Sequence, residues 1–390
     1  MNFLNKYFIF VFASIVLSAF SVQAANLSFV PAAPALSAKS YVLMDFNSGK
    51  IIASKNADER IPPASLTKMM TAYIIDYELA QGNINLNDVV TVSENAWAKN
   101  FPDSSKMFIE PGKTVTVEQL RKGIIIQSGN DASVAIAEHI AGSEDAFVQL
   151  MNSHAQQLGL TGTHFVNSMG LPDPEHYTTA HDMAKLAQAI IRDYPDSYGI
   201  YAMKTYSYNG ISQLNRNRLL WDKSLHVDGL KTGHTNEAGY CLVSSALKDN
   251  MRLIAVVMGT KSEQARKQES KKLLNWGFRF FRTVSPLKPG KSLHKMRVWY
   301  GEEEQLNVGI AKPVYLTVPR GKVKQLKAEF ASGDTIEAPV KKGQIVGKLF
   351  FKIDGKDIKE VPLVALEDME EGGMFSRFGD WMSLKVDSWF

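Results

Sequence analysis

The sequence predicts an α+β protein with two domains, on three observations. A chain of 390 residues with 45% apolar residues is long for one domain and can bury a large core. Up to about residue 284, strand pairs with turn signals are interspersed with amphipathic helical segments. From the linker at residues 286–290 to about residue 366, short β-rich segments are separated by Gly, Pro and Lys. We therefore expect a mixed first domain over residues 25–284 and a small all-β sandwich over residues 285–368.

The amino-terminal segment predicts export. Lys6 precedes an apolar run over residues 7–20, and Val22-Gln23-Ala24 supplies the small residues of a cleavage site. This is the pattern of a secretory signal peptide over residues 1–24. The alternative, a retained membrane anchor, is disfavoured because the run is shorter than the roughly 20 residues of a spanning helix.

The net charge and the cysteine content exclude two features, a nucleic-acid partner and an intramolecular disulfide. The formal net charge of +4 is small, and no basic face or motif indicates a nucleic-acid partner. Cys241 is the single cysteine, so an exported chain of this sequence forms no intramolecular disulfide. Because Cys241 lies in a strand-like run over residues 239–243, we expect a small buried apolar group and not a reactive thiol.

The first domain is expected to begin with a hairpin, because strand-like runs over residues 41–46 and 51–53 flank an Asn-Ser-Gly turn. A second hairpin is expected from residues 239–246 and 252–258, around a Lys-Asp-Asn turn. Helical spacing of apolar residues predicts helices over residues 118–126, 147–158, 180–191 and 268–281.

The second domain is expected to contain strands near residues 296–300, 314–318, 344–353 and 361–366. It shows no catalytic pattern, which favours a spacer or interaction role. Residues 369–390 follow with an amphipathic helix that is expected to lie in a membrane interface. The alternative is a helix docked on the protein's own core. The apolar face of this tail is formed by Phe375, Phe378, Met382, Val386 and Trp389.

Ser65 and Lys68 are the first candidate catalytic residues. A serine three residues before a lysine, at the start of the apolar run 69–75, would place hydroxyl and amine on one helical face, one turn apart. Serine needs a neighbouring base and oxyanion donors for acyl transfer. Alone, this pattern is more often an N-cap serine followed by a solvated lysine.

Two further motifs follow in order. Ser128-Gly129-Asn130 could present a proton-relaying hydroxyl and a carbonyl-binding amide, although such a segment is commonly a helix cap. Lys231-Thr232-Gly233 could lie on a strand that directs Lys231 and Gly233 to one side, with the His234 amide as an oxyanion donor. Alone, it is commonly a loop.

The three motifs together resemble those of penicillin-binding proteins and class A β-lactamases. Those exported proteins have the same motifs in the same order, which are Ser-x-x-Lys, Ser-x-Asn and Lys-Thr-Gly. Further stretches resemble the low-molecular-mass D-alanyl-D-alanine carboxypeptidases of the penicillin-binding protein 5/6 type, and the likeness runs from about residue 40 to the carboxyl terminus. The stretches in which this resemblance is seen are residues 63–71, 128–132, 213–222, 228–235 and 269–274.

The resemblance implies a β-lactamase/transpeptidase-like catalytic domain, with helices on both faces of a five-stranded antiparallel sheet, followed by a β-sandwich. It implies that Ser65 is acylated by the penultimate D-alanine of a peptidoglycan stem pentapeptide, with Lys68 as the base. Ser128 and Lys231 would pass the proton to the leaving amine, and Asn130 would hold the substrate amide.

The same resemblance implies the binding residues. The backbone amides of Ser65 and His234 would form the oxyanion hole. Thr232, Arg216 and Arg266 would lie near the terminal carboxylate. The implied substrate-binding set is therefore Arg216, Lys231, Thr232, Gly233, His234 and Arg266.

One departure from the family concerns deacylation. The family has a His-Gly-Leu-Asp stretch whose aspartate is tied to that step, whereas this sequence has Met169-Gly170-Leu171-Pro172-Asp173. The role of Asp173 is therefore left open. The histidines, including His176 and His181, show no metal-ligand spacing, so we expect neither a metal nor another cofactor.

The leading hypothesis is a periplasmic carboxypeptidase whose tail rests on the outer face of the inner membrane. Its expected partners are the peptidoglycan stem peptide and, as covalent inhibitors, β-lactam antibiotics. A D,D-endopeptidase and a serine β-lactamase are the enzymatic alternatives, and a cell-wall-binding scaffold is the non-catalytic one. The second domain and the tail disfavour a freely diffusing β-lactamase, and the intact motif set disfavours a scaffold.

Overall fold

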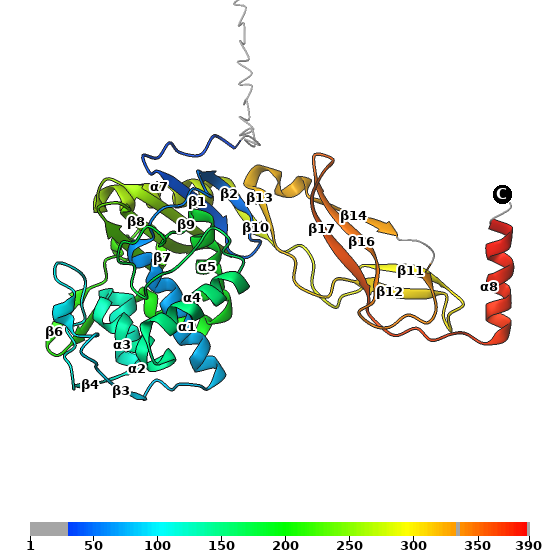
Figure 1. Ribbon diagram of the computed structural model, residues 1–390. Coiled ribbons are helices and arrows are strands. Elements are labelled where there is room, and N and C mark those ends of the chain that lie inside the picture. The colour runs from blue at the N-terminus through cyan, green and yellow to red at the C-terminus, as the bar shows by residue number, and fades with distance from the viewer. Residues whose placement is uncertain (1–29, 333–335, 388–390) are drawn as a thin grey trace, which may run out of the picture.

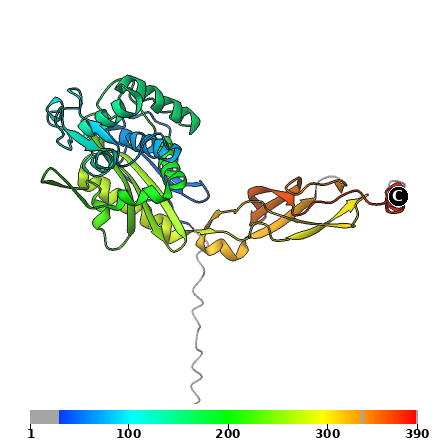
Figure 2. The same ribbon diagram turned by 90° about the horizontal axis from the view of Figure 1, so that it is seen from below.

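The structure is a computed structural model, which describes residues 30–332 and 336–387. The predicted signal peptide lies outside these ranges. Figure 1 shows a large first part, in which helices surround a sheet, and an elongated β-rich second part with helix α8 (Met374–Asp387) at its far end. Figure 2 shows the second part extending away from the first as a narrow rod.

The first part is built on a five-stranded sheet of order β2-β1-β9-β8-β7, in which every neighbouring pair is antiparallel. Both predicted hairpins are present in it. Strand β7 is an edge strand, so one of its sides is open to other groups. The strands are β1 (Ser40–Asp45), β2 (Ile51–Lys55), β7 (His226–Thr235), β8 (Gly239–Lys248) and β9 (Met251–Thr260).

Helices cover both faces of this sheet, as the family resemblance implied. Successive side chains of β9 point to opposite faces. Leu253 packs with Leu273 of α7 (Glu263–Phe280) on one face. Ile254 belongs to the core that contains Met69 of α1 (Lys68–Gln81) and Leu186 of α5 (Ala180–Asp193) on the other. Full burial of each such side chain contributes about 1.5–3 kcal/mol.

Capping side chains explain why helices α4 (Glu144–Gln157) and α7 begin earlier than predicted. Helix α4 starts three residues before the predicted 147, because the Ser143 side chain caps it by accepting from the Ala146 amide. In the same way, Ser262 caps α7 five residues before the predicted start. The predicted helix at 118–126 is α2 (Val117–Lys122), continued by the wider π-helical turn η3 (Gly123–Gln127).

The other short elements of the first part lie between these. The helices are η1 (Ala64–Thr67), η2 (Ala98–Asn100), α3 (Asn130–Ala141), α6 (Pro195–Tyr198), η4 (Gly199–Ala202) and η5 (Arg218–Trp221). Two hairpins are formed by β3 (Val89–Thr91) with β4 (Thr114–Thr116) and by β5 (Thr205–Tyr208) with β6 (Ile211–Leu214).

The second part is all-β, as predicted, apart from the short turn η6 (Arg320–Gln325). Six strands are hydrogen-bonded in the order β14-β16-β17-β12-β11-β15. Their apolar side chains form two small cores, one around Val308 and Leu363 and the other around Leu349 and Phe351. The strands are β11 (His294–Trp299), β12 (Gln305–Gly309), β14 (Lys327–Ser332), β15 (Ile336–Glu337), β16 (Ile345–Ile353) and β17 (Lys356–Ala365).

A buried carboxylate joins the two parts. Strand β10 (Phe281–Val284) pairs with β13 (Leu316–Pro319), and both lie beside the end of β1. The Asp45 Oδ2 accepts hydrogen bonds from Thr283 Oγ1 at 2.5 Å and from Thr317 Oγ1 at 2.8 Å. Because Asp45 is fully buried, these two hydroxyls satisfy a carboxylate oxygen that has no access to water.

The predicted tail helix is present as α8, although Trp389 of its predicted apolar face lies outside the described residues. Met374, Phe378 and Met382 are more than half exposed. Within the described part of the chain, every helix is too short or too polar to cross a bilayer.

Candidate active site

Ser65 and Lys68 lie on one continuous helical turn, where η1 passes into α1. The three-residue spacing brings the two side chains together, and Lys68 Nζ lies 3.2 Å from Ser65 Oγ. Ser65 is half-buried, whereas Lys68 is only 1% exposed. The Ser65 hydroxyl and the Lys68 amine are therefore adjacent, as expected from the sequence. Ser65 lies in a tight 3₁₀ turn, and Lys68 is the first residue of the α-helix.

Two carbonyl oxygens also bind the Lys68 amine. Its Nζ donates to Asn130 Oδ1 at 2.7 Å and to the backbone oxygen of Met169 at 2.6 Å. Burial, and next the charge of Arg216, lower the pKa of the Lys68 amine to about 7, while Asp131 acts in the opposite direction. The amine is thus half neutral near pH 7.

Ser128 lies in a left-handed backbone conformation, with φ at 64°, between η3 and α3. This conformation, which is rare for a residue with a Cβ, turns the chain sharply so that Ser128 and Asn130 both reach the same cavity. Asn130 Nδ2 donates to Ser104 Oγ at 3.0 Å, which fixes the orientation of the carboxamide and leaves its oxygen for Lys68.

The Asp131 carboxylate holds the loop that carries Ser104. It is fully buried and accepts from the backbone amides of Met107, Phe108 and Ile109 at 2.7–3.2 Å. These bonds to successive amides stabilise a loop that forms one wall of the site.

Lys231 comes from the edge strand β7 and is 3% exposed. Its Nζ donates to Ser128 Oγ at 2.8 Å and to Thr232 O at 3.1 Å. Burial holds the pKa of the Lys231 amine well below its usual value, and the charge of Lys68 lowers it further. Gly233 lies so close to η1 that a Cβ would meet Pro63 O at 2.8 Å, which explains the glycine.

Arg266 and His234 line the cavity beyond Thr232. Arg266 is 3% exposed, and its Nη1 donates to Gly233 O at 3.3 Å while its Nη2 pairs with Glu263 at 3.1 Å. The His234 ring stacks on Tyr240, with centroids 3.9 Å apart. The guanidinium of Arg266 is therefore held in place by the strand and helix that flank it.

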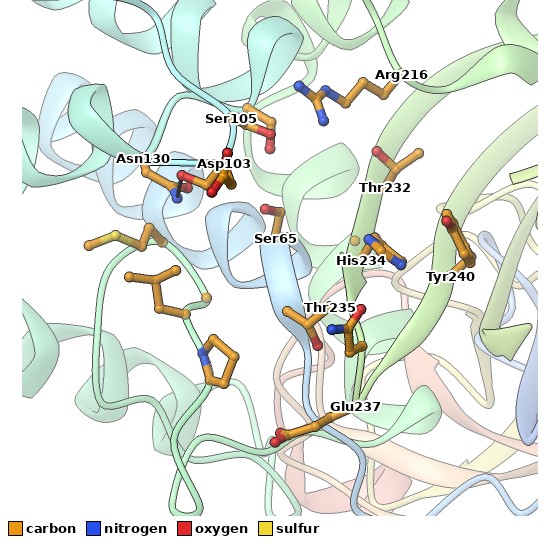
Figure 3. Close-up of a pocket in the computed structure, with 18 of the residues that line it drawn as sticks. Ser65, Asp103, Ser105, Asn130, Arg216, Thr232, His234, Thr235, Glu237 and Tyr240 are labelled. Atoms are coloured by element: carbon orange, nitrogen blue, oxygen red, sulfur yellow. Dashed lines mark hydrogen bonds between the residues drawn. The ribbon is translucent and has the colours of Figure 1, made fainter. Parts of the chain in front are cut away.

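These side chains surround a cavity of about 660 Å³. Figure 3 shows Ser65 in its centre, with Asn130 and Ser105 on one side and Thr232 and His234 on the other. Arg216 lies on the same side of the cavity as Thr232 in Figure 3, and Arg266 also lines the cavity. All the predicted residues thus converge: Ser65, Ser128, Asn130, Arg216, Thr232, Gly233, His234 and Arg266 line the cavity, and Lys68 and Lys231 lie directly behind it.

Asp173, whose role the sequence left open, is exposed and faces its own turn. Its Oδ1 accepts from the Glu175 amide at 2.8 Å, and its backbone oxygen accepts from His176 N at 3.0 Å. The neighbouring residues 169–172 line the cavity instead.

Several wall residues were not singled out from the sequence. Residues 102–105 carry only turn signals, and a backbone acceptor such as Met169 O leaves no side-chain signature. The additional lining residues include Asp103, Ser104, Ser105, Thr235, Glu237 and Tyr240. Across residues 30–332 and 336–387, no three His, Cys, Asp or Glu side chains lie together as a metal-binding group.

Comparison with known proteins assigns this geometry to a family. Residues 28–262 match the D-alanyl-D-alanine carboxypeptidase family, and residues 281–371 match the penicillin-binding protein 5 C-terminal domain family. The chain is 50% identical to D-alanyl-D-alanine carboxypeptidase DacA of Escherichia coli strain K12 over 365 residues, which cover 93% of this chain and 91% of that protein.

Two further relatives cover nearly all of the chain. DacA of Haemophilus influenzae is 47% identical over 98% of both chains. The crystal structure of penicillin-binding protein 5 from Haemophilus influenzae superposes with a TM-score of 0.85 at 48% identity, covering 87% of this chain and all of that one. The chain therefore belongs to the D-alanyl-D-alanine carboxypeptidase family, and it is a serine-type carboxypeptidase of the penicillin-binding protein 5 type.

Proposed function

We propose that Ser65 is the nucleophile with which this carboxypeptidase removes the terminal D-alanine from peptidoglycan stem pentapeptides. The observation that supports this assignment most directly is the buried Lys68 amine, 3.2 Å from Ser65 Oγ, with its pKa lowered to about 7. A base whose pKa lies near the working pH can accept the serine proton and return it within one reaction cycle.

The contacts of Lys68 also set the direction of its lone pair. A protonated amine has three N–H groups, and Ser65 Oγ, Asn130 Oδ1 and Met169 O accept all three. A neutral amine has two N–H groups and one lone pair. The two carbonyl oxygens cannot donate, so they keep the N–H groups, and the lone pair faces the Ser65 hydroxyl.

In the acylation step, Ser65 Oγ forms a bond to the carbonyl carbon of the penultimate D-alanine while Lys68 takes the hydroxyl proton. The backbone amides of Ser65 and His234 would hold the developing oxyanion. The bond to the terminal D-alanine nitrogen then breaks, and the proton reaches that nitrogen through Ser128, which is hydrogen-bonded to Lys231. Water later hydrolyses the ester and regenerates Ser65.

The charge of the cavity suits a substrate that ends in a free carboxylate. Arg216 and Arg266 bring positive charge to the wall that contains Thr232, and the Lys231 amine lies behind this wall. Thr232 can donate a hydrogen bond from its hydroxyl, and the guanidinium groups bind carboxylates with paired N–H donors. We assign the terminal carboxylate of the pentapeptide, or the carboxylate of a penicillin, to this wall.

The test is release of D-alanine from a synthetic pentapeptide ending in D-Ala-D-Ala, measured beside covalent labelling by a fluorescent penicillin. The Ser65→Ala variant should lose both, by at least about 10⁴-fold in turnover, because the acyl-enzyme has no oxygen to form on. An unchanged melting temperature checks that the variant is folded. Persistent labelling of Ser65→Ala would remove Ser65 from this role.

We also propose that the protein works in the periplasm and is held peripherally on the inner membrane by residues 369–390, with residues 25–284 as the catalytic domain and residues 285–368 as a spacer. The polar side of α8 binds the β-rich part, since Asp380 accepts from the Tyr300 amide at 2.7 Å and Arg377 pairs with Glu371. The exposed Phe378 and Met382 are then available to enter the lipid interface.

Deletion of residues 374–390 should move the protein from washed membranes to the soluble fraction, because the exposed apolar side chains are lost. A high-salt wash of the full chain is the control, since apolar insertion resists salt while purely ionic attachment does not. A truncated protein that stays on the membrane would contradict the anchoring role.

A further inference from the structure

The loop of residues 165–176 supplies the Met169 oxygen that binds Lys68, and its base is closed by backbone hydrogen bonds. His164 and Tyr177 exchange two of them, at 2.9 and 3.1 Å. Thr178 and Ile61 exchange two more, at 3.0 and 2.8 Å. The loop is thus joined at its base to the segment that leads into η1.

The loop also packs directly on the turn that carries Ser65. Gly170 has a φ of 93°, and a Cβ at this position would lie 1.9 Å from Ala64 O. Asn167 Oδ1 accepts from the Gly170 amide at 2.6 Å, and Thr71 Oγ1 donates to Ser168 O at 2.6 Å. The position of the Met169 oxygen therefore depends on how this loop is held against η1 and α1.

His176 forms a further link between the loop and this turn. It is 2% exposed, and both of its ring nitrogens are hydrogen-bonded. Its Nδ1 lies 3.0 Å from the Val166 amide, and its Nε2 lies 2.7 Å from Thr67 Oγ1. Thr67 is the last residue of η1, the turn that carries Ser65, and it directly precedes Lys68.

These two contacts determine the tautomer of His176. A backbone N–H can only donate, so Nδ1 must present its lone pair to Val166. The proton of the neutral ring therefore lies on Nε2, which donates to Thr67 Oγ1. A second proton on Nδ1 would meet the Val166 N–H and break that bond.

The surroundings of His176 keep this neutral form. Burial, acting first, lowers the pKa of the imidazole to about 4, with the charges of His164 and Lys68 acting in the same direction and Asp173 opposing them. A neutral ring adds no positive charge beside Lys68. His176 can therefore connect the loop to Thr67 without competing with the proton chemistry of the amine.

We propose that His176 is a positioning residue for acylation, which holds the 165–176 loop on Thr67 so that Met169 O keeps the Lys68 lone pair directed at Ser65. This inference rests on the proposed function of Lys68 as the base. Without the link, the loop would loosen, water would reach the amine, and the Met169 oxygen would no longer retain one of its N–H groups.

The test compares His176→Ala and His176→Gln in the full chain, by the rate constant for acylation with a fluorescent penicillin between pH 5 and 9. We expect His176→Ala to be about tenfold slower at pH 7. The midpoint of its pH profile should rise by about one unit, because hydration relieves the burial that lowers the Lys68 pKa. The charged and titratable groups that interact with Lys68 in this profile are Arg216, Asp131, Lys231 and His176.

His176→Gln should recover most of the rate and the original midpoint, because a carboxamide can accept from Val166 and donate to Thr67. His164→Ala is the matched control, since that histidine lies beside the same loop but its ring bonds Glu175 O through Nδ1, at 2.7 Å, and packs against Tyr177, not against Thr67. It should leave the rate and the midpoint unchanged. Thermal unfolding of each variant checks its fold.

If His176→Ala does not fold, Thr67→Val tests the same link. Valine keeps the shape of threonine but lacks the hydroxyl oxygen that accepts the hydrogen bond from His176. This variant should slow acylation and raise the midpoint in the same way. The inference would be overturned if His176→Ala, or Thr67→Val where His176→Ala does not fold, showed the wild-type acylation rate and midpoint. It would also be overturned if His176→Gln acylated as slowly as His176→Ala.

A fifth variant, Lys68→Met, separates this inference from the proposed function. If Lys68→Met still acylates at the wild-type rate, the assignment of Lys68 as base fails. If Lys68→Met is inactive while His176→Ala behaves as wild type, only the positioning role of His176 fails.

Discussion

Two serine–lysine pairs adjoin the cavity, and they are built in different ways. Ser65 and Lys68 are three residues apart on one helical turn. Ser128 and Lys231 are 103 residues apart and meet only because a left-handed turn and an edge strand of the sheet come together. Nevertheless, the oxygen–nitrogen distances are similar, at 3.2 and 2.8 Å, and both amines are buried.

The difference between the pairs lies in the charges around each amine. Besides burial, Lys231 has its pKa lowered by Lys68, Arg216 and Arg266, which are all positive. Lys68 has the Asp131 carboxylate nearby, which acts to raise its pKa, and the result is a value of about 7. Lys68 thus has a pKa at which the amine changes protonation state near neutral pH, and we assign the Lys231 amine, whose pKa is also lowered, as a hydrogen-bond donor to Ser128.

The largest expected effect comes from removing each amine without removing its volume. Lys68→Met should slow acylation by about 10³-fold or more, because it deletes the base that contacts Ser65. Lys231→Met should slow acylation less, by about 10²-fold, because Lys231 acts through its hydrogen bond to Ser128. Stopped-flow labelling with a fluorescent penicillin measures both.

The ratio of the acylation rates of these two variants tests the roles of the two pairs. The variants are comparable because both replace a buried lysine with an apolar side chain of similar length. Melting temperatures should be compared, because each substitution also removes hydrogen bonds. If Lys231→Met proved the slower of the two in acylation, the roles that we assign to the two pairs would have to be exchanged.

The pH dependence is expected to give a smaller effect, of about 10²-fold between pH 7 and pH 5. The base is active only when neutral, and its pKa of about 7 means that lowering the pH protonates it. The rate of acylation should therefore fall about tenfold for each unit below pH 7 and level off above it. Circular dichroism at each pH separates this loss from acid unfolding.

A midpoint near 10 would show that the amine is hydrated and not buried as the structure has it. A flat profile would mean that a group other than Lys68 takes the serine proton. In the Lys231→Met variant the midpoint should stay the same or rise, because the two amines repel each other and any positive charge on Lys231 disfavours protonation of Lys68.

Local geometry explains which parts of the site could be predicted from the sequence. The Ser65–Lys68 contact depends on helical spacing, and the Lys231-Thr232-Gly233 segment depends on strand alternation, so both follow from short stretches of sequence. The convergence of Ser128 with Lys231 was expected only through the family resemblance, because no local rule relates residues so far apart.

Other features could not be predicted because they have no side-chain pattern. Met169 O is a backbone atom, and its contact with Lys68 depends on how a whole loop packs on η1. Strand β14 was missed because its residues 327–331 are exposed, and strand β15 was missed because it has only two residues. The early starts of α4 and α7 were missed because their first turns lack the apolar spacing used to predict them.

Cys241 provides the opposite case to the two lysines. It lies on β8 opposite Gly233 of β7, and it is fully buried and unpaired, as predicted from its strand-like surroundings. Burial raises the pKa of its thiol to about 11. Burial disfavours the charged form in every case: it makes an amine a usable base near pH 7, and it makes a thiol an inert group.

The smallest expected effect is therefore that of Cys241→Ala. Carboxypeptidase turnover should stay within about twofold of wild type, because the thiol touches no reacting group, and the free energy of unfolding should fall by about 1 kcal/mol through lost packing. The native chain should resist a thiol reagent at pH 8, whereas the chain unfolded in guanidinium should react at its one cysteine. Rapid modification of the native protein would mean that β8 opens readily beside Gly233, and the rigid placement of Lys231 would then need revision.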